Sequence, residues 1–179
     1  MPASQIVYLS LGSNLGDRAA FLDRAIEALG AAGVRVLRRS AIYETEPVDA
    51  PAQGWFLNMV VEAETALAPQ ALLGALLGIE RSLGRERIVP RGPRTIDIDI
   101  LLYGAIVVRE AGVAIPHPSM AARRFVLVPL AELAAGVRHP VVGRTIAELL
   151  AACADASRVV AWRPGDGDLL SDIAQEPHT

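Results

Sequence analysis

Aromatic residues and cysteines are scarce in this chain of 179 residues. Phe, Trp and Tyr together make up 4% of it, and Cys153 is the single cysteine. One cysteine cannot form an internal disulfide, which fits a reducing compartment such as the cytoplasm. With few ring faces for stacking bases, a sheet that reads RNA is disfavoured, and each well-placed aromatic has to be weighed separately.

The chain also lacks a basic excess, a secretory signal and a long apolar run. Its formal net charge is −3, whereas generic nucleic-acid binders usually carry a basic excess. The first residues lack the basic and apolar regions of a signal peptide. No apolar run reaches the roughly 18 residues that span a bilayer. We therefore expect a soluble cytoplasmic monomer that acts on small molecules, with neither nucleic acid nor membrane as a partner.

What the chain does contain is the alternating pattern of an α+β domain. Apolar spacing and turn residues predict strands over 5–11, 34–45, 55–65 and 95–103, and helices over 18–31 and 69–82. The order βαββαβ is that of the ferredoxin-like fold, in which helices pack on an antiparallel sheet.

Residues 104–179 follow this core as an appendage. The pattern predicts a short hairpin around 106–115 and helical segments near 126–134 and 145–153. We assign 1–160 to a single domain and 161–179 to a polar tail, which we expect to be flexible.

The most unusual stretch is RTIDIDIL, in which two acids alternate with isoleucines. Side chains alternate along a strand, so Asp97 and Asp99 share one face and the isoleucines take the other. One interpretation is the solvated outer face of a half-buried sheet. The other is a cation site, because Mg²⁺ prefers oxygen ligands and completes its shell with water and substrate phosphates. The chain offers no Cys/His grouping that would suggest zinc instead.

Four arginines lie close to these acids along the chain, in or next to the basic loop 83–93: Arg85, Arg87, Arg91 and Arg94. They are either ordinary surface charges paired with nearby acids, or a phosphate-binding group, since guanidinium binds phosphate in a bidentate and permanently charged way. Beside a magnesium site, the second interpretation predicts a polyphosphate substrate.

Two further stretches are less specific. SLGSNLGDR, residues 10–18, is a Gly-rich strand-to-helix turn that would bind an anion, but it lacks the Gly-Lys-Ser/Thr ending of a Walker A loop. A tight turn with Asp17 as helix N-cap is the simpler interpretation. In IPHPSMAARRF, residues 115–125, two prolines frame His117, which is either structural or a phosphate contact.

Taken together, these stretches resemble the 6-hydroxymethyl-7,8-dihydropterin pyrophosphokinase family of folate synthesis. The matching pieces occur in the family's order: YLSLGSNLGDR (8–18), YETEPV (43–48), FLNMVVEAET (56–65), IERSLGRER (79–87), RGPRTIDIDILLYG (91–104) and IPHPSMAARRFVLVPLAEL (115–133). They cover most of residues 5–135, and two of them, LGSNLGD and GPRTIDIDIL, are highly specific.

The resemblance implies an enzyme that transfers the β,γ-pyrophosphoryl group of ATP to the pterin's hydroxymethyl oxygen and releases AMP. It implies that Asp97 and Asp99 bind two Mg²⁺ ions, and that Arg85 and Arg94 neutralise charge during the reaction. Other residues fall at nucleotide-binding positions of the family: Glu80, Arg87, Arg91, Ile100, His117 and Arg123. A third set falls around the pterin: Thr45, Val48, Phe56, Asn58 and Phe125.

The pterin positions also make independent physical sense. A flat heterocycle favours aromatic faces, and Phe56 and Phe125 would enclose it from two sides. Asn58, on the same strand face as Phe56, offers a donor and an acceptor to the amide-like edge of the ring. The alternative is that Phe56 is simply a core residue.

The chain departs from the family pattern in three places. Arg91 runs directly into Gly92, so the basic loop is one residue shorter and lacks an aromatic; Glu46 stands where proline is frequent; and Pro118 stands where an aromatic also occurs. These departures bear on loop packing and substrate affinity more than on the reaction. The rival interpretation is a ferredoxin-like module that binds a ligand without catalysis, because fold alone does not fix function.

Overall fold

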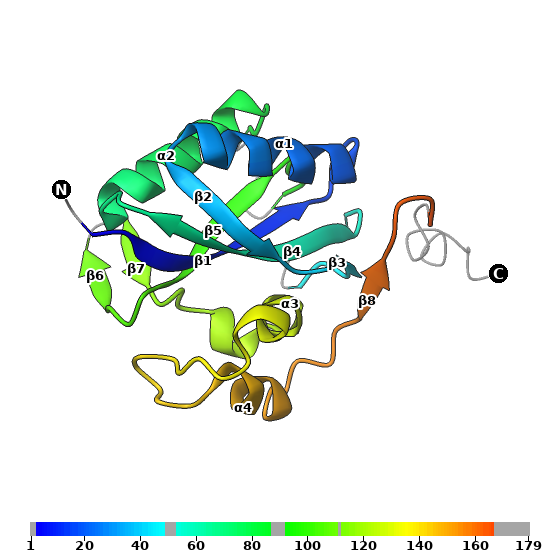
Figure 1. The fold of residues 1–179 in the computed structure, drawn as a ribbon. Helices are drawn as coiled ribbons and strands as arrows, with labels where there is room; N and C mark the ends of the chain where they lie inside the picture. The colour runs from blue at the N-terminus through cyan, green and yellow to red at the C-terminus, as the bar shows by residue number, and fades with distance from the viewer. Residues whose placement is uncertain (1–2, 49–52, 87–91, 111, 167–179) are drawn as a thin grey trace.

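A single antiparallel sheet organises the molecule. The computed structural model describes residues 3–48, 53–86, 92–110 and 112–166. In this part of the chain, six strands form the main sheet in the order β5-β1-β4-β3-β8, with β2 also paired to β4 (Figure 1). Their bounds are Gln5–Ser13 (β1), Val34–Arg39 (β2), Ile42–Thr45 (β3), Phe56–Thr65 (β4), Asp97–Tyr103 (β5) and Val159–Trp162 (β8).

Two helices cover one face of the sheet, as Figure 1 shows: α1, Arg18–Ala31, and α2, Pro69–Ser82. Asp17 begins α1, since its side chain accepts a hydrogen bond from the amide of Ala20, 3.2 Å away. Proline begins α2, where its missing N–H costs nothing. The α1 and α2 apolar faces pack with β1, β4 and β5 into the larger core. The predicted ferredoxin-like order and α+β class are therefore confirmed.

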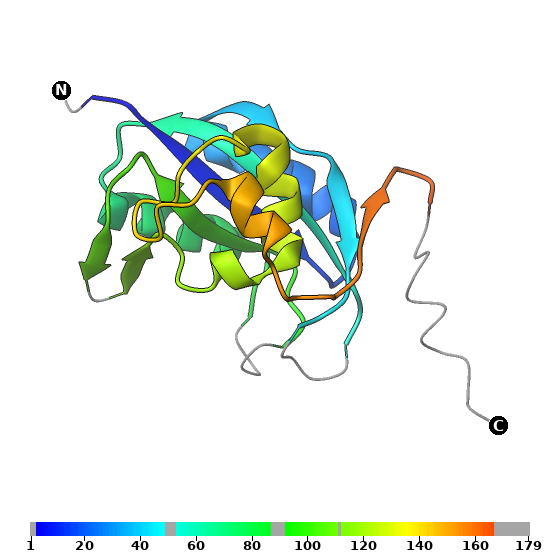
Figure 2. The ribbon, with the colours of Figure 1, turned by 90° about the horizontal axis from the view of Figure 1, so that it is seen from below.

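Helices α3, Arg124–Ala134, and α4, Ile146–Ala151, lie on the opposite face (Figure 2). A β-bulge in β5 prepares that face, because Leu9 pairs with Ile100 while Tyr8 pairs with Leu102. The bulge places both Leu101 and Leu102 in the second core cluster, against α3. The leucine end of β5 thus shares a core with α3, which itself packs mainly on β4, while the end of β5 that begins at Asp97 lines the site.

The appendage after β5 also follows the prediction. Strands β6, Val108–Glu110, and β7, Val113–Ile115, form the expected hairpin. A 3-10 turn, η1, Met120–Ala122, then leads into α3. Among the described residues no helix combines the length and apolar character of a bilayer span.

The segment predicted as one strand over 34–45 is two strands, β2 and β3, that pair with different parts of β4. At the break, the amide of Val60 donates to the Ser40 hydroxyl, and the amide of Ala41 donates to the Glu132 carboxylate, at 2.9 and 2.8 Å. At the break, side-chain oxygens therefore accept hydrogen bonds from backbone amides in place of strand carbonyls. The break is stabilised by hydrogen bonds between residues far apart in the sequence, which the spacing of apolar residues alone does not reveal.

Two strand ends also differ from the predictions. We expected the first strand to end at a turn at Gly12, but β1 continues to Ser13, because both β4 and β5 pair with Gly12 and β4 also pairs with Ser13. Strand β8 was not predicted; it pairs with β3 and crosses the boundary set at residue 160. Residues 167–179 of the predicted tail lie outside the described residues.

A charged cluster links the sheet to α3. Glu62 on β4 accepts hydrogen bonds from Tyr8 Oη, at 2.8 Å, and from Arg38 Nη2, at 2.6 Å. The same Arg38 nitrogen donates to the carbonyl of Leu133 in α3, at 2.7 Å. The hydrogen bond from Arg38, aided by the one from Tyr8, holds the pKa of Glu62 below its ordinary value.

We expect Glu62→Gln to lower the free energy of unfolding at pH 7 by about 1 kcal/mol, because two donors lose a charged acceptor and solvent screens part of the ion pair. Since folding lowers the Glu62 pKa, the wild-type advantage should be present above the ordinary pKa of 4.5 and fade as the pH falls below it. Urea titrations of both proteins at several pH values measure this. Glu64→Gln, at the exposed Arg35 pair, is the control, and a Glu62→Gln deficit independent of pH would contradict the assignment.

Candidate active site

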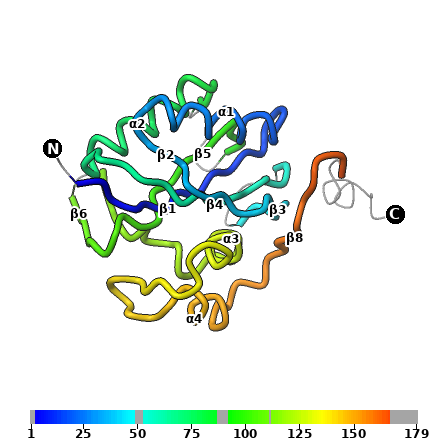
Figure 3. The backbone as a smooth tube through the Cα atoms, in the orientation of Figure 1, coloured from blue at the N-terminus to red at the C-terminus, as the bar shows by residue number. Residues whose placement is uncertain are grey.

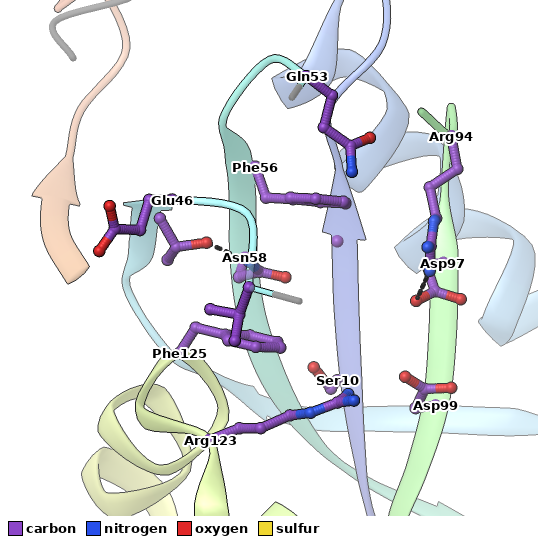
Figure 4. A pocket seen from close by; sticks show the side chains of 13 residues that line it. Ser10, Glu46, Gln53, Phe56, Asn58, Arg94, Asp97, Asp99, Arg123 and Phe125 are labelled. Carbon is purple, nitrogen blue, oxygen red and sulfur yellow. Dashed lines mark hydrogen bonds and ion pairs between the residues drawn. The ribbon is translucent and has the colours of Figure 1, made fainter. Parts of the chain in front are cut away.

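A cavity of about 160 Å³ opens on the sheet face that carries α3 (Figure 4). Strands β1, β3, β4 and β5 and the start of α3 contribute its walls. Most of the sequence-predicted residues within the described ranges line it: Thr45, Val48, Phe56, Asn58, Arg94, Asp97, Asp99, Arg123 and Phe125.

The acid pair lies in this cavity and not on a flat outer face. Asp97 and Asp99 project from β5 toward the same space, opposite Gly12 and Ser10 of β1 (Figure 4). The isoleucines between and beside them are buried in the core beneath α1 and α2. Alternation along the strand therefore separates a chemical face from a packing face, as the pattern predicted.

Two arginines neutralise Asp97. Arg85 Nη1 lies 2.6 Å from one carboxylate oxygen, and Arg94 Nη1 lies 3.0 Å from the other. Arg85 is shared with Glu80, whose Oε2 is 2.7 Å from the same nitrogen. Glu80 is only 3% exposed, and burial raises its pKa above the ordinary value despite the arginine. The cluster thus packs two carboxylates around one guanidinium.

Asp99 is in a different electrostatic position. Burial between the cavity walls raises its pKa to about 7, and the negative charges of Asp97 and Glu80 act in the same direction. Its side chain keeps 39% of its surface open, but that surface faces the cavity. Ionising Asp99 therefore concentrates negative charge here, which a bound cation would relieve.

His117 lies beside Asp99, with Nε2 and Oδ2 separated by 3.9 Å. Its amide donates to the carbonyl of Leu101, at 3.0 Å, which places it next to β5. Its Nδ1 accepts from the amide of Ser119, at 3.1 Å, so the neutral ring carries its proton on Nε2. Burial, together with the positive charge of Arg123, lowers the pKa of His117. A neutral donor therefore faces the acid side of the cavity.

The other side of the cavity is a flat compartment. The rings of Phe56, from β4, and Phe125, from α3, lie on either side of an open space with Asn58 behind it (Figure 4). Asn58 Nδ2 donates to the Thr45 hydroxyl, at 2.7 Å. Each ring also has a guanidinium carbon within 6 Å of its centroid: Arg94 at 5.8 Å from Phe56 and Arg123 at 5.7 Å from Phe125.

Gly12 is required for the position of Asn58. A Cβ at residue 12 would lie 2.5 Å from Asn58 Oδ1, closer than non-bonded contact allows. Gly12 pairs directly with Asn58 across β1 and β4, so the missing side chain makes room for the amide group. The sequence pattern predicts only a turn at this glycine, and that prediction is wrong, because Gly12 lies inside β1.

Asn14 is a second residue that the sequence analysis missed. Its Oδ1 accepts from the amide of Arg94, at 2.8 Å, and its Nδ2 donates to Gln53 Oε1 and the Gly54 carbonyl, at 2.9 and 3.0 Å. One buried side chain thus joins the segments before β4 and before β5, which border the cavity. The alternation of small and polar residues with leucines along SLGSN is the signal that would have revealed this face.

Several predicted residues lie elsewhere. Arg87 and Arg91 lie outside the described residues, as does part of the loop 46–54. The side chain of Ile100 belongs to the core on the opposite face of β5, so only its backbone is available to a ligand. Glu46, Gln53, Ser10 and Gly12 line the cavity although none was predicted to do so.

Comparison with known proteins gives this cavity a context. Residues 8–135 match the model of the family described as 7,8-dihydro-6-hydroxymethylpterin-pyrophosphokinase. The 2-amino-4-hydroxy-6-hydroxymethyldihydropteridine pyrophosphokinase of Methylorubrum extorquens is 48% identical over 80% of this chain and 90% of its own. The enzyme of the same name from Bacillus subtilis is 42% identical over 92% and 94%. A folic acid synthesis protein of Pneumocystis carinii is 42% identical over 80% of this chain, which spans only 20% of that protein.

Solved structures support the fold. The wild-type HPPK-DHPS of Plasmodium falciparum, crystallised with pterin and p-hydroxybenzoate, superposes with a TM-score of 0.65 at 17% identity, over 83% of this chain and 41% of that one. A second wild-type structure, with STZ-DHP, gives a TM-score of 0.68 over 83% and 43%. The present chain therefore spans less than half of those proteins, and at this identity the likeness concerns the fold alone.

We expect Asn14→Ala to release the Arg94 segment, because the Arg94 amide loses its acceptor. Hydrogen exchange at that amide should accelerate by about tenfold or more, the effect of losing one buried hydrogen bond. Ser82→Ala, which removes a side-chain hydrogen bond to Ile79 at the end of α2, is the control and should leave the Arg94 amide unchanged. Equal protection of Arg94 in wild type and Asn14→Ala would show that Asn14 does not hold this segment.

Proposed function

This chain belongs to the 7,8-dihydro-6-hydroxymethylpterin-pyrophosphokinase family, and from that premise we propose how its own residues share the reaction. A member of this family is an enzyme of folate biosynthesis. It transfers pyrophosphate from ATP to 6-hydroxymethyl-7,8-dihydropterin and forms the pterin diphosphate and AMP. A bond forms between the hydroxymethyl oxygen and the β-phosphorus, and the bond from that phosphorus to the oxygen bridging the α-phosphate breaks.

One observation carries the assignment of roles: a single cavity joins a flat aromatic compartment to a charged one. Phe56 and Phe125 suit the two faces of a pterin ring, and Asn58 and Thr45 suit its polar edge. Asp97 and Asp99 line the same space. A pterin held between the rings would therefore lie next to the groups that hold the phosphates.

The charged compartment suits a magnesium-bound triphosphate. Among the described residues, no three His, Cys, Asp or Glu side chains gather as an all-protein metal cage. Asp97 and Asp99 supply carboxylate oxygens alone, so a cation here would complete its shell with water and phosphate oxygens, as Mg²⁺ does. The raised pKa of Asp99 agrees with this fit, because burial and, after it, the negative charges of Asp97 and Glu80 disfavour an ionised carboxylate that has no cation beside it. When bound, two Mg²⁺ ions would reduce the charge on the triphosphate under attack.

Arg85 and Arg94 are proposed to change partners during the reaction. Both bind Asp97 in this structure. They would give up these contacts when cations bind the carboxylate, and their N–H groups would then be available to phosphate oxygens. The guanidinium groups of these arginines, which already lie in the site, would then stabilise the negative charge of the transferred group. Such positioning and charge stabilisation are the main requirements of phosphoryl-type transfer.

The remaining polar residues are proposed to hold the nucleotide. His117 offers an uncharged Nε2–H, and Arg123 extends from the start of α3 toward the acid side of the cavity (Figure 4). Glu80 holds Arg85 from beneath. Arg87, Arg91 and the backbone of Ile100 stay predictions. Because the reaction consumes ATP and Cys153 forms no disulfide, we still expect the protein in the cytoplasm, and the monomeric state stays a prediction.

The experiment that tests this function measures AMP from ATP in the presence and absence of the pterin and Mg²⁺. AMP should form only when all three are present, because the pterin hydroxyl is the acceptor. Binding of ATP or pterin without AMP formation would support the rival interpretation of a non-catalytic module.

We expect Asp97→Asn and Asp99→Asn each to reduce turnover by about a thousandfold or more, because each removes a charged oxygen ligand that the transition state needs. Calorimetric titration with Mg²⁺ in the presence of a non-hydrolysable ATP analogue should show weaker binding. Asp99→Asn should keep or raise the melting temperature, since it relieves repulsion from Asp97 and Glu80. Turnover and Mg²⁺ affinity near wild type would remove the metal assignment.

We expect Gly12→Ala to weaken pterin binding by about tenfold or more, because the new methyl group displaces the Asn58 amide and its partner Thr45. Equilibrium binding measured by pterin fluorescence gives the affinity. Gly74→Ala is the matched control: a Cβ there meets no heavy atom within 4 Å, and an alanine inside α2 should stabilise the fold without changing affinity. If both variants bind pterin as the wild type does, Asn58 does not contact it.

A further inference from the structure

The segment after α4 runs along the outside of the candidate site. Residues 154–162, here called the C-terminal strap, leave the end of α4 and finish as β8 at the edge of the sheet (Figure 3). Seen from below, this stretch passes from the α3 and α4 layer to the edge that carries β3 (Figure 2). It therefore spans between α3 and β3, two elements that each contribute a wall of the cavity.

The first tie of the strap is to α3. Asp155 Oδ2 accepts a hydrogen bond from the amide of Arg124, at 2.9 Å, and Asp155 Oδ1 accepts from the amide of Ser157, at 2.9 Å. Arg124 is the first residue of α3, and its own N-cap, Arg123, makes no side-chain capping bond. A carboxylate from the strap thus caps this helix between its two cavity residues, Arg123 and Phe125.

The electrostatics of Asp155 agree with that role. Burial raises its pKa, but the hydrogen bonds from the Arg124 and Ser157 backbones outweigh burial, so that the pKa lies below the ordinary value. Asp155 is therefore charged at neutral pH, and a charged acceptor at a helix N-terminus is favourable.

The second tie of the strap is to the wall that β3 contributes. The amide of Arg158 donates to Glu46 Oε1, at 2.8 Å, and the amide of Glu46 donates to the Arg158 carbonyl, at 3.3 Å. The pairing then continues as β8 against β3, with Val159 opposite Thr45. Figure 4 shows β8 behind the wall that holds Glu46. Thr45 in turn holds Asn58.

A tie elsewhere on α3 shows what the strap adds. Glu132, in the last turns of α3, accepts hydrogen bonds from the Tyr43 hydroxyl and the Ala41 amide, and so fixes that end of the helix to the β2–β3 break. The end with Phe125 is held to the same edge of the sheet through the strap. Without the strap, α3 would remain anchored at Glu132 while its cavity end gained freedom to move.

We propose that the C-terminal strap sets the separation between the Phe125 wall and the Thr45–Asn58 wall, and that Asp155 and the Arg158 backbone are positioning groups for the pterin. Neither contacts the substrate; they act through Arg124 and Glu46. The inference rests on the proposed function, since it takes the aromatic compartment as the pterin site. It predicts an effect on pterin affinity that is larger than any effect on ATP.

The test begins with Asp155→Ala in the full-length chain. The dissociation constant for the pterin, measured by fluorescence, should rise about five- to tenfold. The variant loses a charge-assisted hydrogen bond, and only part of that loss should reach the pterin site. The dissociation constant for ATP should change by less than about twofold. Asp155→Asn keeps one acceptor oxygen, so its dissociation constant for the pterin should lie between those of the wild type and Asp155→Ala. Glu148→Ala, which removes an exposed carboxylate of α4, is the control.

The other end of the strap gives an independent pair of variants. Glu46→Ala should weaken pterin binding, whereas Glu46→Gln keeps an acceptor for the Arg158 amide and should restore most of the affinity. Were Glu46 instead a charged contact of the pterin, both variants would lose affinity equally. This pair also carries the test if Asp155→Ala fails to fold.

A double-mutant cycle decides whether the strap acts as one unit. If one strap holds both walls, releasing either end should produce most of the effect, and Asp155→Ala with Glu46→Ala should be clearly less than additive. Additive effects, unchanged pterin affinity, or equal losses for pterin and ATP would each overturn the proposal. The assignments fail separately: AMP formation by the wild type with no Asp155 effect removes the strap alone, whereas an Asp155-dependent pterin affinity without AMP formation removes the reaction alone.

Discussion

Two carboxylates on successive inward positions of β5 repel each other, and the rest of the site is arranged around that repulsion. Asp97 is neutralised by Arg85 and Arg94, while burial, aided by the negative charges of Asp97 and Glu80, raises the pKa of Asp99 to about 7. A protein selected for stability alone would not keep this arrangement, because like charges in a shielded cavity cost free energy. This cost is consistent with the proposed role of the two acids in binding a cation.

The sheet can carry this charged cavity because the two faces of a single strand have different surroundings. One face packs into the core, and the other carries the charged side chains of the cavity. Ile98 and Ile100 bury their side chains beneath α1 and α2 while the acids between them face the cavity. The bulge at Leu101 then returns β5 to apolar packing against α3. The change from charged to apolar surface therefore takes place within a few residues of one strand.

The spacing of apolar residues was enough to predict the elements of the core. Each helix and most strands bury one face, and the apolar residues of that face recur at a regular interval within the element itself. This spacing failed where distant residues make the structure. At the break between β2 and β3, Ser40 bonds to Val60 and Ala41 bonds to Glu132, and β8 forms by pairing with β3, far from it in the sequence. Asn14 was missed for the same reason, since its partners lie in segments far along the chain. The resemblance, rather than the pattern, is the source of the predictions of which residues bind the pterin and the nucleotide.

The two halves of the cavity differ in how ready they are for a ligand. On the flat side, Asn58 is already bonded to Thr45, Gly12 leaves it space, and the two phenylalanine rings stand apart with open space between them. On the charged side, the arginines and Asp97 satisfy one another. A flat ligand would therefore enter with little reorganisation, whereas a polyphosphate has to exchange one set of ion partners for another. Because the proposed exchange would replace one charged partner with another, the arginines and Asp97 would each keep a partner of opposite charge in both states.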